Sequence, residues 1–134
     1  MQDTPSFRNV RAARKRIAGR IHETPLLSSD TLSQLAGVEV LFKCENLQKS
    51  GSFKYRGALN AVLALPATVR KLGVATHSSG NHGAALAAVA QRLNIPATIV
   101  VPNTASAFKQ DNIRRYGGRI VHCGKTLKSR EQKL

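Results

Sequence analysis

Gly73-Val74-Ala75-Thr76-His77-Ser78-Ser79-Gly80-Asn81-His82-Gly83 is the stretch from which the fold of this chain follows. Residues 73–77 form a short apolar run typical of a strand, and residues 84–93 form an alanine-rich run typical of a helix that packs closely on a sheet. The segment between them contains glycines for backbone freedom and serine and asparagine for capping. The stretch therefore predicts a strand, a tight polar turn and a helix.

The pattern repeats toward the C-terminus. Residues 97–101 are a continuous, β-branched run between Pro96 and Pro102, which suits a buried parallel strand. Residues 108–116 read as a helix closed by two glycines, residues 119–123 as a strand, and Leu127 onward as a helix in which the chain ends. Alternating strands and helices with short connections predict an α/β fold with a doubly wound parallel sheet.

Toward the N-terminus, residues 6–21 predict an amphipathic helix with arginines on its solvated face, which ends before Pro25. A short helix is expected over residues 31–36, with Gly37 as a left-handed C-terminal residue. Residues 38–44 alternate apolar and charged side chains, and we expect them to form another strand of the parallel sheet.

A second polar turn, Gln48-Lys49-Ser50-Gly51-Ser52-Phe53-Lys54-Tyr55-Arg56-Gly57, follows that strand. Ser52 is a candidate N-cap, so Lys54 is expected at the mouth of a helix, where the helix dipole favours a neutral, nucleophilic amine. Ligands bind at the carboxyl ends of parallel strands, so the lysine turn and residues 78–83 are predicted at one anion-binding edge. The alternatives are a solvated surface lysine and a turn whose glycines and hydroxyls serve only the backbone.

Composition sets limits on the function. The chain has 134 residues, 42% of them hydrophobic, and no apolar run long enough for a membrane span or a secretory signal. Cys44 and Cys123 lack metal-site spacing, as do His22, His77 and His122, which predicts no metal site and a reducing, cytoplasmic setting.

The net charge is +14, from 21 Lys and Arg against 7 Asp and Glu. Such a charge attracts nucleic acid, anionic lipid or phosphorylated small molecules. Aromatic residues make up only 4% of the chain, so specific recognition of nucleic acid by stacking is not expected.

Residues 43–60 and 76–83, in that order, closely resemble the serine racemase and serine/threonine dehydratase family. These are pyridoxal-phosphate enzymes of the tryptophan synthase β fold type, also called fold type II. The resemblance implies that Lys54 forms the Schiff base with pyridoxal 5'-phosphate, that Phe53 flanks the cofactor ring, and that Asn81 hydrogen-bonds its phenolic oxygen.

The resemblance also implies a substrate site. Ser79 matches a serine that acts as acid and base in the racemases. The residues implied to contact the substrate are Ser78, Gly80, His82 and Arg130. The implied activity is dehydration of L-serine or L-threonine to a 2-oxo acid and ammonia, or racemisation of serine with Ser79 as the proton donor. Both reactions begin with loss of the α-proton, so the choice between them and the preferred amino acid stay open.

Further properties follow only from the resemblance. Serine racemases bind ATP with Mg²⁺ near positions that correspond to Ser28-Ser29 and Lys49-Ser50, although Asp30 disfavours a triphosphate unless a metal ion intervenes. The family forms homodimers.

The resemblance covers the N-terminal portion of a family chain well over twice this length. Residues 1–45 are expected to belong to the large domain and residues 46–134 mostly to the small domain. The phosphate loop, the partner of the pyridine nitrogen and the acidic metal site are expected in the remainder of the large domain, outside this sequence. The second hypothesis is therefore a truncated, non-catalytic chain that binds polyanions weakly through its basic ends.

Overall fold

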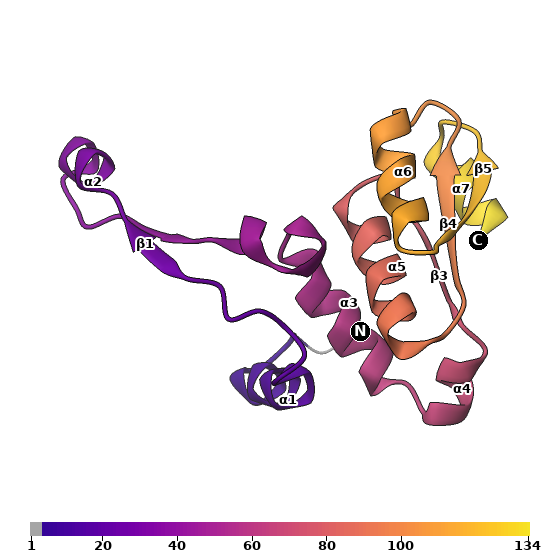
Figure 1. Cartoon of the computed structure of the whole chain (residues 1–134), viewed down its shortest axis with the longest axis horizontal. Coiled ribbons are helices and arrows are strands. Elements are labelled where there is room, and N and C mark those ends of the chain that lie inside the picture. The colour runs from indigo at the N-terminus through magenta and orange to yellow at the C-terminus, as the bar shows by residue number, and fades with distance from the viewer. Residues whose placement is uncertain (1–3) are drawn as a thin grey trace.

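The computed structural model describes residues 4–134, which form an α/β unit and a projecting arm (Figure 1). The longer elements of the α/β unit are α3 (Lys54–Ala64), α4 (Ala67–Lys71), β3 (Val74–His77), α5 (Asn81–Leu93), β4 (Ala97–Pro102), α6 (Ala107–Arg115), β5 (Arg119–Cys123) and α7 (Leu127–Lys133). They are preceded by α1 (Phe7–Ile17), β1 (Leu26–Ser28), α2 (Asp30–Ala36), β2 (Leu41–Lys43) and two short 3-10 turns, η1 (Glu45–Leu47) and η2 (Lys49–Gly51).

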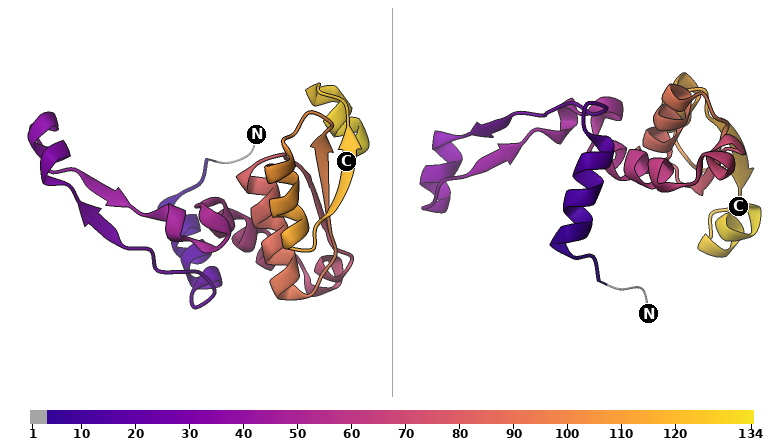
Figure 2. Two further views of the ribbon diagram at one scale, coloured as in Figure 1. Left: turned by 45° about the horizontal axis from the view of Figure 1, so that its top comes forward. Right: turned by 90° about the horizontal axis from the view of Figure 1, so that it is seen from below.

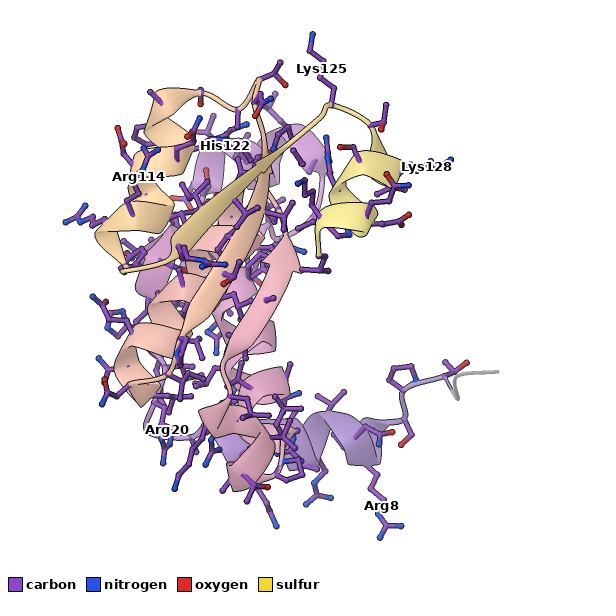
Figure 3. The ribbon with its side chains drawn as sticks, turned by 90° about the vertical axis from the view of Figure 1, so that its right-hand side faces the viewer. Arg8, Arg20, Arg114, His122, Lys125 and Lys128 are labelled. Carbon is purple, nitrogen blue, oxygen red and sulfur yellow. The ribbon has the colours of Figure 1, made fainter. Side chains whose placement is uncertain are left out.

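The parallel sheet predicted from the C-terminal half is confirmed. Its strand order is β3-β4-β5, and the register aligns His77 with Val100 and Pro102 with Cys123. Helices α5 and α6 pack on one side of the strands, whereas α7 packs on β4 and β5 from the other side, where it is drawn in yellow in Figure 3. The carboxyl ends of the three strands therefore meet at one edge, from which the loop of residues 78–80 leads into α5.

Helix α5 is the centre of the core. Every residue from Gly83 to Ala90 is buried, because the helix lies between the sheet and α3. A helix enclosed on two sides needs small side chains all round, which explains its alanines. The fully buried residues of β4 and α6, Ile99, Val101 and Ile113, complete this core.

The placement of β2 corrects one prediction. This strand is only three residues long and pairs antiparallel with β1, from Leu26 opposite Lys43 to Ser28 opposite Leu41, in a sheet of its own. With α2 at its tip, this hairpin forms the arm, which extends away from the parallel sheet in the views of Figure 2. Alternation of apolar and charged residues predicted a strand correctly, but strand periodicity does not say which sheet the strand joins.

The apolar side chains of the arm are largely uncovered. All residues of β1 and β2 are exposed, and so are Leu32 and Leu35 of α2. The same holds for the first half of α1, where Phe7 and Val10 are exposed while Ile17 is buried near α3. A two-stranded hairpin is marginal by itself, so this arm depends on the anchors at its base.

Two local predictions change as well. The N-cap of α3 is Phe53 rather than Ser52. The chain after Pro66 forms the short helix α4, which the sequence did not indicate. The left-handed residue at Gly37 is confirmed, with φ of 68°. No helix within residues 4–134 is both long and apolar enough to cross a membrane.

Candidate active site

Lys54 occupies the first turn of α3. Its side chain is exposed, and its Nζ lies 4.9 Å from the centroid of the Phe53 ring. No side-chain cap closes this helix start, and the buried hydroxyl of Ser52 has no hydrogen-bond partner among the described residues. The sequence predicted the helix mouth correctly.

The serine loop, residues 78–80, makes a tight turn between β3 and α5. The Ser78 hydroxyl accepts hydrogen bonds from the backbone N–H groups of Gly80, at 3.3 Å, and Gly83, at 3.1 Å. A Cβ atom at Gly83 would lie 2.6 Å from the Ser78 carbonyl oxygen, so the turn approaches the helix too closely for a side chain. Ser78 thus closes the turn, which is a structural role beside the substrate contact that the resemblance implies.

The groups that follow Ser78, in the loop and at the start of α5, remain open to a ligand. Asn81 and His82 begin α5 and are exposed, and the space where a Cβ of Gly80 would lie is empty to 4 Å. No hydrogen bond within residues 4–134 involves the Ser79 hydroxyl or the Asn81 amide. These groups are therefore free to bind an incoming molecule.

Packing of α3 against α5 brings the lysine turn and the serine loop together. The pKa of His82 is lowered by partial desolvation and then by the nearby positive charges of Lys54 and His77, which favours a neutral imidazole. The predicted proximity of Lys54 and His82 is thus correct, but it arises from helix packing rather than from two loops at the edge of one sheet.

A charged cluster that the sequence reasoning missed anchors the lysine turn. Arg56 donates from Nε to Glu45 Oε2 at 2.9 Å and from Nη2 to Glu45 Oε1 at 2.7 Å. The buried Thr24 hydroxyl donates to Glu45 Oε1 at 2.6 Å. The hydrogen bond from Arg56, and then that from Thr24, lowers the pKa of Glu45 to about 2 against the cost of burial.

A buried glutamine forms the second anchor. Gln48 is 3% exposed; its Oε1 accepts from the His22 and Lys49 N–H groups, and its Nε2 donates to the His22 carbonyl at 2.8 Å. Glu45 and Gln48 both precede Lys54 within ten residues, but the segment that they hold, at Thr24 and His22, lies more than twenty residues earlier. Only information on which distant residues contact each other could have identified Glu45 and Gln48 as anchors.

The Glu45 carboxylate makes stability depend on pH. Its folded pKa of about 2 lies below the ordinary 4.5, so its contribution is complete above about pH 4.5 and disappears as the pH falls toward 2. We expect Glu45→Gln to lower the free energy of unfolding by about 2 kcal/mol at neutral pH and to flatten its decline in acid. Urea unfolding across this pH range measures both effects, with Asp111→Asn, from the exposed Asp111–Arg114 pair, as the control.

Arg130 and the segments implied for ATP are not joined to this cluster. Arg130 lies on α7, where its Nη2 donates to the Lys125 carbonyl, and no described hydrogen bond connects it with the lysine turn or the serine loop. Ser29 caps α2 at the tip of the arm, whereas Lys49 lies at its base beside α3 (Figure 1). Within one chain, the two segments implied for ATP are therefore far apart.

The basic residues do not form one patch. Arg8 and Arg20 lie at one end of the molecule in Figure 3, and Lys125 and Lys128 lie at the other. Residues 4–134 contain no group of three or more His, Cys, Asp or Glu side chains arranged to hold a metal ion.

Comparison with known proteins places the chain in a family. Residues 17–134 match the family described as pyridoxal-phosphate dependent enzyme. The chain belongs to this family. It is 50% identical over 124 residues to a serine racemase of Arabidopsis thaliana, covering 92% of this chain and 38% of that protein. Its identity with a beta-hydroxyaspartate dehydratase of Paracoccus denitrificans (strain Pd 1222) is 46% over 128 residues, covering 96% of this chain and 41% of that protein.

A solved structure agrees with the sequence relatives. The threonine deaminase of the organism abbreviated T.th. superposes with a TM-score of 0.85 at 43% identity, covering 96% of this chain and 40% of that one. The α/β fold is thus that of the fold-type II pyridoxal-phosphate enzymes, as predicted. The chain spans about two fifths of the length of the relatives that it matches.

The residues present fit the cofactor of this family. The groups present are an exposed primary amine at Lys54, a neighbouring aromatic ring at Phe53 and an unpaired amide at Asn81, which have the chemistry needed for a covalent attachment, a ring contact and a hydrogen bond. The empty space beside Gly80 leaves room for a bound group. The roles of these residues remain predictions of the resemblance.

Proposed function

We propose that this protein acts in pyridoxal-phosphate-dependent dehydration of L-serine or L-threonine to a 2-oxo acid and ammonia, with racemisation of serine as a second outcome. The observation that carries the proposal is the placement of the Lys54 amine and the unpaired groups of the serine loop at the starts of two packed helices, in a member of this family. The names of its relatives, a serine racemase, a dehydratase and a threonine deaminase, support the substrate class.

In this proposal, bound pyridoxal phosphate supplies an electron-withdrawing ring that makes the α-proton of an attached amino acid acidic. Lys54 would hold the cofactor covalently, and its Nζ would accept the α-proton of the substrate. Asn81 donates its amide to the phenolic oxygen. The backbone N–H groups of Asn81 and His82, at the start of α5, bind the substrate carboxylate, with Ser78, Gly80 and Arg130 as further contacts.

Ser79 separates the two outcomes. Its hydroxyl is the proposed proton donor to Cα, so Ser79→Ala should reduce racemisation of serine by at least about 10²-fold while dehydration continues, because only racemisation needs a proton returned to Cα. Chiral chromatography of serine and a coupled assay for the 2-oxo acid measure the two products after addition of pyridoxal phosphate.

Product formation without the cofactor, or equal losses of both products in Ser79→Ala, would contradict these assignments. Ser33→Ala provides the matched control, since Ser33 lies on α2 at the tip of the arm and its hydroxyl accepts from the Val40 N–H at 2.9 Å.

The remaining assignments are proposals that rest on the family resemblance or, for the location and the excluded partners, on the composition of the sequence. They are a homodimer, regulation by ATP and Mg²⁺, a cytoplasmic location without membrane or specific nucleic-acid partners, and a boundary between large and small domains near residue 45. The alternative function, weak polyanion binding by a non-catalytic chain, is supported by the net charge of +14. It requires an affinity for polyanions that falls steeply as salt is added.

A further inference from the structure

The Glu45–Arg56 pair joins three segments that are distant in the sequence. Glu45 opens the first turn after the arm, Arg56 lies in the first turn of α3, and Thr24 belongs to the segment that leads from α1 into the arm. Lys54 is two residues before Arg56. The pair therefore ties the base of the arm to the turn of helix that carries Lys54.

This pair differs from an ordinary surface ion pair. Exposed pairs contribute little because water screens them and their side chains lose entropy. Here the side chains are only 28% and 19% exposed, the arginine contact is bidentate, and Thr24 occupies a further position on the carboxylate. A bidentate contact fixes orientation as well as distance. By contrast, Asp111 and Arg114 on α6 are 69% and 53% exposed and joined by one bond.

The start of α3 has few other restraints. Ser50 and Gly51, directly upstream, adopt left-handed backbone conformations with φ of 63° and 74°. The helix lacks a side-chain cap, and the Lys54 ammonium has no described hydrogen bond of its own. The direction of the Lys54 side chain thus depends on the backbone around it. That backbone is held by the buried Tyr55 ring on one side and by the Arg56 fork on the other.

We propose that Glu45 is a positioning residue for Lys54: through the fork to Arg56 and the bond from Thr24, it sets the orientation of the first turn of α3 and hence of the lysine amine. The proposal rests on the proposed function, because the consequence of the orientation is covalent attachment of pyridoxal phosphate at Lys54. Removing the Glu45 charge leaves Lys54 chemically intact but lets its helix turn move. A displacement of about 1 Å is enough to slow a reaction by about 10²-fold.

The test uses Glu45→Gln and Arg56→Lys, with Asp111→Asn as the control. Amide hydrogen exchange of Tyr55 and Arg56, whose N–H groups bond to Ser52 and Phe53 carbonyls, reports on the helix turn without any cofactor. The rate of pyridoxal phosphate attachment, trapped by borohydride reduction and located by peptide mass spectrometry, reports on Lys54. We expect both variants to speed exchange and to slow attachment by about tenfold or more, and the control to change neither.

Each result decides the question. Unchanged exchange in Glu45→Gln, or faster exchange with an unchanged attachment rate at Lys54, overturns the positioning role. Partial recovery of attachment in the charge-swapped double variant, Glu45→Arg with Arg56→Glu, supports it, because recovery shows that the ion pair, rather than either side chain alone, sets the attachment rate. A wild-type chain that attaches no cofactor at Lys54 overturns the proposed function and with it this inference, whereas normal attachment in wild type and Glu45→Gln alike overturns the inference alone.

Discussion

Lys54→Ala abolishes covalent attachment of pyridoxal phosphate, the largest effect that we expect of any substitution in this chain. Lys54 is the lysine at the start of α3, beside Phe53 and close enough to the serine loop for its charge to lower the pKa of His82. Alanine keeps the helix, since it is the best helix former, and removes the amine together with the aliphatic stem that carries it. The change is measured as loss of the visible absorption band of the attached cofactor and of the borohydride-trapped adduct.

Lys71→Ala is the matched control, because Lys71 is an exposed lysine at the end of another helix, α4. It should retain the full absorption band. An adduct that persists in Lys54→Ala, or that maps to other lysines in the wild-type chain, would show that the attachment is the unspecific reaction of an aldehyde with a basic protein. A chain with a net charge of +14 offers many amines to an aldehyde. The peptide map distinguishes this unspecific reaction from attachment at Lys54.

Gly83→Ala is expected to destabilise the fold by about 3 kcal/mol, because it overfills a closely packed turn. The added Cβ would lie 2.6 Å from the Ser78 carbonyl oxygen and 3.0 Å from Ile99 Cγ2. Ile99 is fully buried in β4 and cannot yield, so the serine loop itself must shift. Thermal unfolding followed by circular dichroism measures the loss.

Gly57→Ala provides the comparison. Gly57 lies inside α3, and a Cβ there meets nothing within 4 Å, so alanine should stabilise the helix by about 0.5–1 kcal/mol. Equal effects of the two substitutions would mean that helix propensity, rather than the close approach of the serine loop to α5, decides the response at Gly83.

Local patterns in the sequence were sufficient for the parallel unit. The strands and helices from Gly73 to Leu134 follow from β-branched runs, an alanine-rich helix and glycine or proline boundaries. The structure confirms the strand at 119–123 residue by residue. The sequence was also sufficient to select Lys54 and the serine loop as candidate site residues, because each belongs to a polar turn next to the start of a helix. These features are encoded within a few residues of one another.

Contacts between distant residues decided the rest. The sequence placed Lys54 beside the serine loop through a shared sheet edge, but β2 pairs with β1 in the arm, and the packing of α3 on α5 creates the proximity instead. Nothing in the sequence indicated that the hydrogen bonds of Glu45, Gln48 and Thr24 hold the lysine turn in place. The reason is physical: periodicity records which side of an element is apolar, whereas strand partners and buried ion pairs depend on which segments meet, and only tertiary packing determines that.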